Sequence, residues 1–303
     1  MQRILNLYSL AQRFAGRHNS GMTVKATQQP APAQIPLDTD DIAWLKDYAA
    51  DVEREFRKQF STASGRFSDS EKLLGRFTAA INAVLKHGRS KFHVVDEAHN
   101  ELSVAAALLA NSEPKFVWLE YEPPLPRSPQ SIDFRATGDD GWTVYVDTKT
   151  IKPQAKDRWE QFEETRKHGR FTPNVEIVIK KEWLGGEIWH SMFAARGRML
   201  EYTLELESKI EAASLQADKT AVILMLCGEG FHWHQDDLED FVSFYYSGRH
   251  RADDPFARME DHEIRKTGIT FQRSITRFAC MNRPQGDIAY RRLNWNVQAP
   301  RHP

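Results

Sequence analysis

Apolar residues recur along this chain with two different periods, and the change of period separates predicted helices from predicted strands. A spacing of three to four residues predicts amphipathic helices over residues 38–60, 68–88 and 92–111. Short runs rich in β-branched and aromatic residues follow, and they predict strands over residues 115–122, 131–137 and 142–151. The first half of the chain is therefore predicted to be three helices followed by three strands.

The second half mixes both periods. It predicts a charged helix over 156–169, a short strand and turn over 174–186, a long helix over 192–215, a strand over 220–228, a helix over 236–248 and a late strand over 268–281. The run "TAVILMLCG" is almost wholly apolar, as in strands that are buried on both faces. Together these elements predict an α/β fold in which helices flank a central mixed β-sheet.

Composition divides the chain into four predicted parts. Residues 1–39 are predicted to form a flexible N-terminal tail, because the segment 23–36 is polar and rich in proline. An added helical region over 40–90, a main domain over 91–290 and a C-terminal tail over 291–303 follow. Residues 1–21 contain no acidic residue and several arginines, which is typical of an amphipathic targeting segment and also of a start codon upstream of the native one. Of these two interpretations we favour a native start at Met22.

Net charge and cysteine content limit the partners and the cellular compartment that we expect for this protein. The 41 basic and 42 acidic residues give a net charge of −1, so contact with a polyanion needs a local basic patch. The two cysteines, Cys227 and Cys280, lie in predicted strands and fit a reduced, cytoplasmic protein better than a disulfide framework. No apolar run is long enough to cross a bilayer, so no membrane partner is expected.

The candidate catalytic residues lie on the hairpin formed by the second and third predicted strands. Alternation places Ile132 and Phe134 on its apolar side, and it places Asp133, Asp147 and Lys149 on the opposite side. Charged groups near the centre of a half-buried hairpin are costly unless they are paired or bind a metal. Two converging carboxylates also repel each other unless a cation lies between them. The pattern therefore indicates a cation site.

The helix before the hairpin supplies a third carboxylate. Glu101 lies on the same arc as Ala98, Val104 and Leu108, which is predicted to pack against the sheet. A glutamate on a packed arc needs a functional or structural partner. Glu97, one turn earlier, is an alternative to Glu101.

A helix glutamate, an aspartate that enters a strand and an Asp-x-Lys motif that ends the next strand resemble the PD-(D/E)XK nuclease superfamily, whose fold is also called restriction-endonuclease-like. The matching residues are Glu101 in "NELS", Asp133 in "SIDF" and Asp147-Thr148-Lys149 in "VDTKT". The order of elements also resembles that of the superfamily: helix, three strands, helix, strand. The resemblance implies a restriction-endonuclease-like core with an added helical N-terminal region.

The resemblance covers about residues 92–228, which is under half of the chain. Ser131-Ile132 stands where the superfamily carries its signature proline, a position that varies widely. Residues 153–195 are interpreted as an insertion between the third strand and the second core helix.

The resemblance implies a metal-dependent nuclease, expected to be an endonuclease, that hydrolyses phosphodiester bonds of DNA in restriction, repair or phage defence. It implies Mg²⁺ or Mn²⁺ as cofactor, with Asp133, Asp147, Glu101 and the Thr148 carbonyl as ligands. Lys149 would orient the attacking water and neutralise charge. The protein would act as a homodimer or as a component of a multi-protein system. We expect Asp147→Ala or Lys149→Ala to abolish cleavage and to leave the melting temperature nearly unchanged.

Three basic residues near the motif are candidate DNA phosphate contacts: Arg135, Lys152 and Lys156.

Other interpretations of the same residues remain open. The hairpin carboxylates and Lys149 are alternatively a solvated face with a surface ion pair. Alternatively, the protein has a nuclease-like fold without catalytic activity, and it binds nucleic acid or another protein. His232 and His234 with Asp236 or Asp237 are an alternative metal site. The simpler interpretation of this segment is a loop in which Asp236 or Asp237 caps the next helix. The phosphate-binding, dinucleotide-binding, hydrolase and zinc-protease signatures are absent from the sequence.

Overall fold

The structure is a computed structural model, and it describes residues 36–63, 65–112, 114–150, 187–215, 217–227, 235–248, 270–282 and 292–294. For residues 187–197, 235–237, 282 and 292–294 it describes the backbone alone. The chain divides into a unit of residues 1–33 and a unit of residues 34–303, and every described residue belongs to the second unit.

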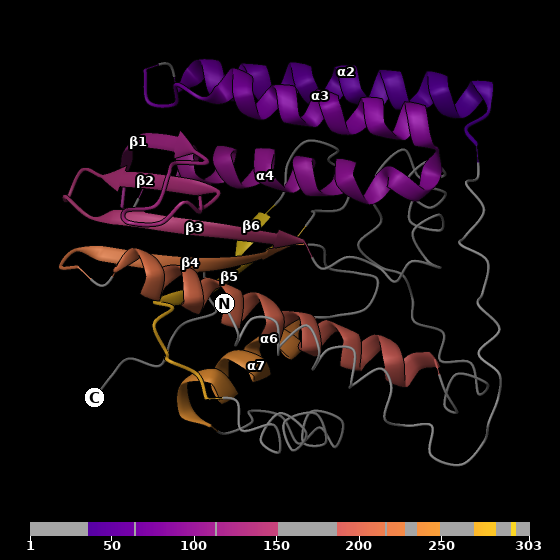
Figure 1. Cartoon of the computed structure of the whole chain (residues 1–303). Helices are drawn as coiled ribbons and strands as arrows, with labels where there is room; N and C mark the ends of the chain where they lie inside the picture. Colours follow the sequence, from indigo (N-terminus) through magenta and orange to yellow (C-terminus); the bar gives the residue numbers. More distant parts are fainter. Residues whose placement is uncertain are drawn as a thin grey trace, which may run out of the picture. The chain divides into compact units, whose positions relative to one another are not determined.

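Among the described residues, three helices lie on one side of the sheet (Figure 1). They are α2 (Thr39–Thr62), α3 (Ser70–His87) and α4 (Phe92–Ala110), and the short 3₁₀ turn η1 (Arg89–Lys91) precedes α4. A capping box begins α2: the Asp38 carboxylate accepts a hydrogen bond from the Asp41 N–H at 2.7 Å, and the Asp41 carboxylate accepts one from the Asp38 N–H at 3.1 Å. Helix α3 ends at Gly88, whose φ of 81° is a conformation that favours glycine.

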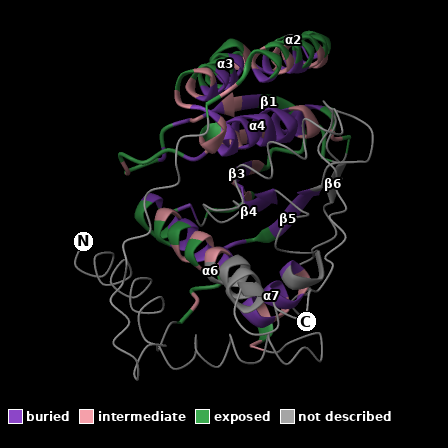
Figure 2. Cartoon of the chain, turned by 90° about the vertical axis from the view of Figure 1, so that its right-hand side faces the viewer, coloured by how far each residue is buried: buried purple, intermediate pink, exposed green. Residues whose placement is uncertain are grey.

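Helix α4 is buried around most of its circumference, because it lies between α2 and α3 on one side and the sheet on the other (Figures 1 and 2). Fourteen of its 19 residues are buried, and several of these are polar. Buried polar groups need partners, and the Tyr48 hydroxyl of α2 provides one for the ring of His99 at 2.8 Å. A helix with both sides packed therefore positions its polar residues rigidly, and Glu101 is one of them.

In the part of the chain that the structure describes, the sheet has six strands, and they lie in the order of the chain. They are β1 (Phe116–Tyr121), β2 (Phe134–Gly138), β3 (Thr143–Thr150), β4 (Thr220–Cys227), β5 (Arg277–Asn282) and β6 (Arg292–Asn294). Strands β1, β2 and β3 form an antiparallel meander, β3 pairs with β4 and β4 with β5 in parallel, and β6 is antiparallel to β5. The sheet is therefore mixed, with β3 and β4 at its centre.

Two helices, α6 (Glu187–Ala213) and α7 (Gln235–Ser247), cover the second face of the sheet (Figure 1). The sheet consequently separates two apolar cores. Phe134 and Val146 pack with α2, α3 and α4, whereas Tyr145 and Leu224 pack with α6 and α7. Alternation along β3 thus directs Asp147, two residues after Tyr145, towards α6.

The prediction of an α/β fold with helices flanking a mixed sheet, preceded by N-terminal helices, is confirmed. The prediction that Ile132 and Phe134 share a face is wrong: Ile132 packs in the core of α6 and α7, opposite to Phe134. The reason is that β2 begins only at Phe134, after a bend at Asp133, so strand alternation does not extend back to Ile132.

Elsewhere the boundaries differ at three places. Helix α6 begins at Glu187, five residues before the predicted start at 192 and inside the segment 153–195 that was interpreted as an insertion. The late strand predicted over 268–281 is shorter, since β5 begins only at Arg277. Strand β6 lies within the segment 291–303 that was predicted to be a tail. The charged helix and the strand predicted between 156 and 186 lie outside the described residues. In the part of the chain that the structure describes, no helix combines the length and apolar character needed to span a bilayer.

Candidate functional site

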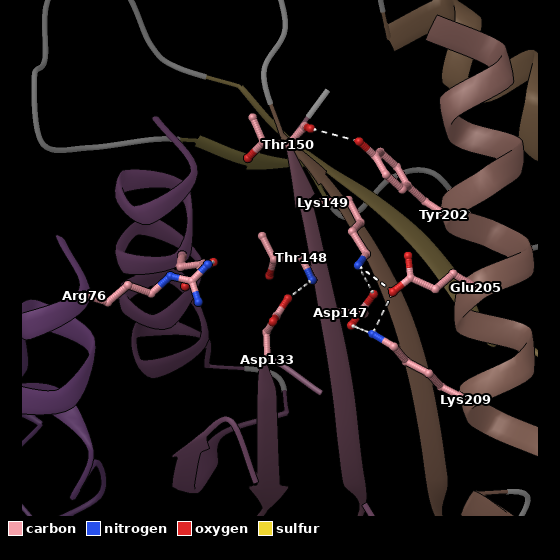
Figure 3. A network of polar contacts seen from close by, with 10 residues as sticks. Arg76, Asp133, Asp147, Thr148, Lys149, Thr150, Tyr202, Glu205 and Lys209 are labelled. Atoms are coloured by element: carbon pink, nitrogen blue, oxygen red, sulfur yellow. Dashed lines mark hydrogen bonds and ion pairs between the residues drawn. The ribbon is translucent and has the colours of Figure 1, made fainter. Parts of the chain in front are cut away.

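Asp133 lies where strands β2 and β3 separate. The ladder between them ends at the pair Phe134–Val146, and beyond it the Asp133 carboxylate accepts a hydrogen bond from the Thr148 N–H at 2.5 Å (Figure 3). A side chain thus replaces the next main-chain partner of β3. The N–H and C=O of one strand residue point to the same side, so the Thr148 carbonyl faces the same gap as Asp133.

Asp147 and Lys149 extend from β3 towards α6 (Figure 3). Asp147 is 1% exposed, and its two oxygens contact the Lys149 ammonium at 3.3 Å and the Lys209 ammonium at 3.0 Å. Both lysines also contact Glu205, at 3.1 and 3.2 Å. The Lys149 ammonium faces the ring of Tyr202, with 5.8 Å between the ring centre and Nζ. One edge of α6 therefore completes the site on this face of the sheet.

Glu101 approaches from α4, on the other face of the sheet. It is buried, accepts a hydrogen bond from the Tyr121 hydroxyl at 2.7 Å, and pairs with the Arg76 guanidinium at 2.8 Å. Arg76 belongs to α3 and also contacts Glu122 at 3.3 Å. The added helical region therefore contributes a residue to the site.

Burial and neighbouring charges raise the pKa values of two carboxyl groups of the site, Glu101 and Asp133. Burial raises the pKa of Glu101 to about 7, although Arg76 and Tyr121 favour its ionised form. Burial also raises the pKa of Asp133 well above its ordinary value, and the charges of Asp147 and Glu101 raise it further. Asp133 thus interacts with the carboxylates on both sides of the sheet, and the three form one electrostatic cluster.

For Lys149, the lysine of the motif, neighbouring charges outweigh burial in setting the pKa. Burial alone would lower the pKa of Lys149, but the Asp147, Glu205 and Asp133 carboxylates raise it above its ordinary value. For Glu205, burial would raise the pKa, and the Lys149 and Lys209 ammonium groups lower it instead. Lys149 is therefore a stable ammonium group at neutral pH.

The chemistry of the donors suits a hard divalent cation. Carboxylate oxygens and a main-chain carbonyl are the ligands that Mg²⁺ and Mn²⁺ prefer. Two buried oxygens, Oδ2 of Asp147 and Oγ1 of Thr148, form no hydrogen bond within the described part of the chain, although Oδ2 lies 3.3 Å from the Lys149 ammonium group. Among the described residues, no three His, Cys, Asp or Glu side chains are already arranged to hold a metal ion. The carboxylates are instead held by Arg76, Lys149 and Lys209, so a bound cation requires an exchange of partners.

Of the four predicted catalytic residues, Asp147 and Lys149 are in direct contact, and the charges of Asp147 and Glu101 act on Asp133. Arg135 pairs with Glu120 of β1 rather than with the acidic cluster. Glu97, the alternative to Glu101, lies one turn earlier and raises the pKa of Glu101 by repulsion. Lys152, Lys156, His232 and His234 lie outside the described residues, and only the backbone of Asp236 and Asp237, within α7, is described.

Four residues of the site were not identified from the sequence: Arg76, Tyr121, Glu205 and Lys209. The spacing of four between Glu205 and Lys209, along the edge of a predicted core helix, was a usable signal. Arg76 gives no comparable signal, because its contact with Glu101 depends on how α3 packs on α4.

No protein-family model, no curated protein and no solved structure matches this chain. Its function is therefore inferred from the chemistry of the cluster and from the elements that hold it.

Proposed function

We propose that this chain is a metal-dependent nuclease of the PD-(D/E)XK type, with a restriction-endonuclease-like core, that hydrolyses phosphodiester bonds of DNA. The observation that carries the proposal is the Asp147–Lys149 pair at the end of β3 beside Asp133, where β2 and β3 part, with Glu101 close enough for its charge to act on Asp133. The order of α4, the strands β1 to β3, α6 and β4 supports the same conclusion.

Asp133, Asp147, Glu101 and the Thr148 carbonyl would hold the Mg²⁺ or Mn²⁺ ion. When bound, such an ion supplies Lewis acidity and lowers the pKa of a coordinated water molecule. Asp133 and Glu101 coordinate only as carboxylates, so both must release the protons that their raised pKa values retain. Arg76 and Tyr121 hold the Glu101 carboxylate in place meanwhile.

Lys149 acts as a donor of hydrogen bonds and not as a base. Because its pKa is raised, the side chain keeps its proton at neutral pH. An ammonium group in this position orients the attacking water and stabilises the negative charge that develops on the phosphate oxygens. Asp147 and Glu205 fix the direction of the ammonium group through ion pairs.

DNA is the proposed substrate, and Arg135, Lys152 and Lys156 are proposed phosphate contacts outside the cluster. Arg135 would exchange its partner Glu120 for a phosphate group. The two buried, free cysteines fit the proposed cytoplasmic setting, where thiols stay reduced.

DNA cleavage tests the proposal directly. Supercoiled plasmid, linear duplex and single-stranded DNA are incubated with the purified chain and Mg²⁺, Mn²⁺ or a chelator. We expect nicking or linearisation of the plasmid with either metal, none with chelator, and none for Asp147→Asn or Lys149→Met. Lys219→Met, a change directly before β4 and at the end of the strand away from Asp147, is the matched control and should retain activity. Full activity of both site variants would refute the assignment.

A catalytically silent nuclease-like fold that binds nucleic acid or another protein is the second candidate. The observation that favours it is that both oxygens of Asp147 contact lysines, an arrangement that is complete without a metal. A thermal shift separates the two candidates. Stabilisation by Mn²⁺ that is lost in Asp133→Asn supports the nuclease, and the absence of any metal-dependent stabilisation supports the silent module.

A further inference from the structure

Four side chains form a closed ring of ion pairs between β3 and α6 (Figure 3). Asp147 contacts Lys149 at 3.3 Å, Lys149 contacts Glu205 at 3.1 Å, Glu205 contacts Lys209 at 3.2 Å, and Lys209 contacts Asp147 at 3.0 Å. The two acidic and the two basic residues alternate around the ring. Each element supplies one acidic and one basic residue.

The members of the ring differ in their access to water. The side chain of Asp147 is 1% exposed and that of Lys209 is 12% exposed, whereas Glu205 is 48% exposed. A carboxylate as buried as Asp147 is costly without a counter-charge, so the ammonium groups are necessary when no metal is present. Glu205 lies at the solvent end of the ring, where a charge is easily accommodated.

A divalent cation at Asp147 conflicts with one of the two lysines. Lys209 occupies Oδ1 and Lys149 faces Oδ2, so a cation that binds Asp147 meets an ammonium group at either oxygen. Like charges at such separations repel strongly in a partly buried site. Lys149 is the proposed donor to the reacting groups, so Lys209 is the residue that must yield. Glu205 already contacts Lys209 and can retain it.

We propose that Lys209 is a positioning residue that takes the place of the metal on Asp147 in the metal-free protein and withdraws to Glu205 when a divalent cation binds. This inference rests on the proposed function, because it presumes that Asp147 is a metal ligand. The exchange keeps the buried carboxylate paired in both states. It also weakens metal affinity, because each binding event must break the contact between Lys209 and Asp147.

Calorimetric titration of the full chain with Mn²⁺ alone, without DNA, tests the exchange. We expect Lys209→Met to bind Mn²⁺ about tenfold or more tightly than the unmodified chain, and Lys209→Arg to bind as the unmodified chain does. In the absence of metal, Lys209→Met should melt at a lower temperature, and saturating Mn²⁺ should remove this difference. Lys219→Met is the control and should change neither quantity.

A double-mutant cycle separates exchange from a general effect of charge. Glu205→Gln removes the group that receives Lys209, and it should weaken Mn²⁺ binding several-fold in the unmodified chain but have little effect in Lys209→Met. If the two substitutions change Mn²⁺ affinity by independent factors, Glu205 and Lys209 act on the metal only through their charges at a distance. That result would overturn the proposed exchange. If Lys209→Met does not fold, Lys209→Gln, which also removes the charge but keeps a polar side chain, completes the same cycle.

The outcomes for this inference and for the proposed function are distinct. Mn²⁺ affinity unchanged or weakened in Lys209→Met, together with binding that Asp133→Asn abolishes and DNA cleavage by the unmodified chain, would reject the role of Lys209 alone. Absence of Mn²⁺ binding in every variant would reject the metal site and the exchange together.

Discussion

The two faces of the sheet hold their carboxylates in different ways. On the α4 face, Glu101 has one guanidinium and one hydroxyl as partners, and burial outweighs both, so its pKa rises to about 7. On the α6 face, Glu205 and Asp147 share two ammonium groups, and the pKa of Glu205 falls below its ordinary value. One face therefore retains a proton near neutral pH, whereas the other retains ion pairs.

Asp133 stands between the faces, since charges on both raise its pKa. The difference means that a cation would enter by two separate processes. On the α4 face, metal binding must release protons, so it depends on pH. On the α6 face, the cation must displace an ammonium group, and this exchange does not depend on pH in the neutral range. Substitutions on each face should therefore have distinguishable signatures.

The largest effect is expected from removal of Asp147 on the α6 face. Asp147→Ala leaves Lys149 and Lys209 partly buried with only Glu205 between them, and breaking a buried ion pair typically costs about 3–5 kcal/mol. The structure thus revises the expectation of an unchanged melting temperature for this variant. Urea denaturation of the metal-free chain measures the loss.

The matched control is Glu53→Ala on the exposed side of α2, where Glu53 pairs with Arg57. Exposed pairs contribute little, so the control should lose less than about 1 kcal/mol. Equal losses in the two variants would show that Asp147 is not held by a buried network.

Substitution of Glu101 should reveal the proton on the α4 face. The folded protein retains this proton up to a pKa of about 7, whereas the unfolded chain releases it near its ordinary value of 4.5. The folded state binds more protons between these values, so stability falls as pH rises through this window. Glu101→Gln has no proton to lose, and it should be more stable than the unmodified chain by on the order of 3 kcal/mol above pH 7.

Below pH 4.5 the two proteins should have nearly equal stability, because Glu101 is then protonated in both folded and unfolded states. Denaturation in urea from pH 4.5 to 8 measures the difference. A difference that is constant over this range would mean that Arg76 and Tyr121 keep Glu101 ionised and that burial does not prevail.

Much of the fold was predictable because apolar periodicity is a local property. The helices α2, α3 and α4 and the strands β3 and β4 begin or end within a few residues of their predicted limits. Strand β5 was predicted too long for a tertiary reason: the buried Glu207 carboxylate accepts hydrogen bonds from the Gln272 and Arg273 N–H groups, at 3.1 and 2.7 Å. Those groups then cannot serve a strand, and no local pattern reveals this.

The residues of the site also divide into some that local sequence predicts and others that depend on tertiary packing. Asp133, Asp147 and Lys149 were found because two adjacent strands carry them at short separation in the sequence. Lys209 is 62 residues from Asp147, and Arg76 reaches Glu101 from another helix. Their roles follow from helix packing, so a single sequence does not indicate them.

A smaller effect is expected from the hydroxyl group that serves Glu101. Tyr121→Phe removes a hydrogen bond to a carboxylate, and it should cost about 2 kcal/mol at pH 8, where Glu101 is ionised, and about 1 kcal/mol at pH 5.5. Tyr245→Phe is the control for the loss of a buried hydroxyl; it removes the hydrogen bond to Glu207 and also the acceptor of the Ile275 N–H. We therefore expect about 2–3 kcal/mol for that control. A loss for Tyr121→Phe that does not depend on pH would contradict the titration of Glu101.

The smallest effect is expected from Glu205, at the solvent end of the α6 face. Glu205→Gln should reduce stability by less than about 1 kcal/mol, because a half-exposed carboxylate forms weak ion pairs. That loss should disappear in about 1 M NaCl, where the Debye length falls to about 3 Å, whereas most of the loss in Asp147→Ala should remain. The same variant should still reduce DNA cleavage several-fold at saturating Mg²⁺, since Lys149 loses the anchor that sets its direction. Unfolding at low and high salt, beside a cleavage assay, measures both quantities. Cleavage that is unchanged in Glu205→Gln would mean that Asp147 alone directs Lys149, and the ring would then be a feature of stability only.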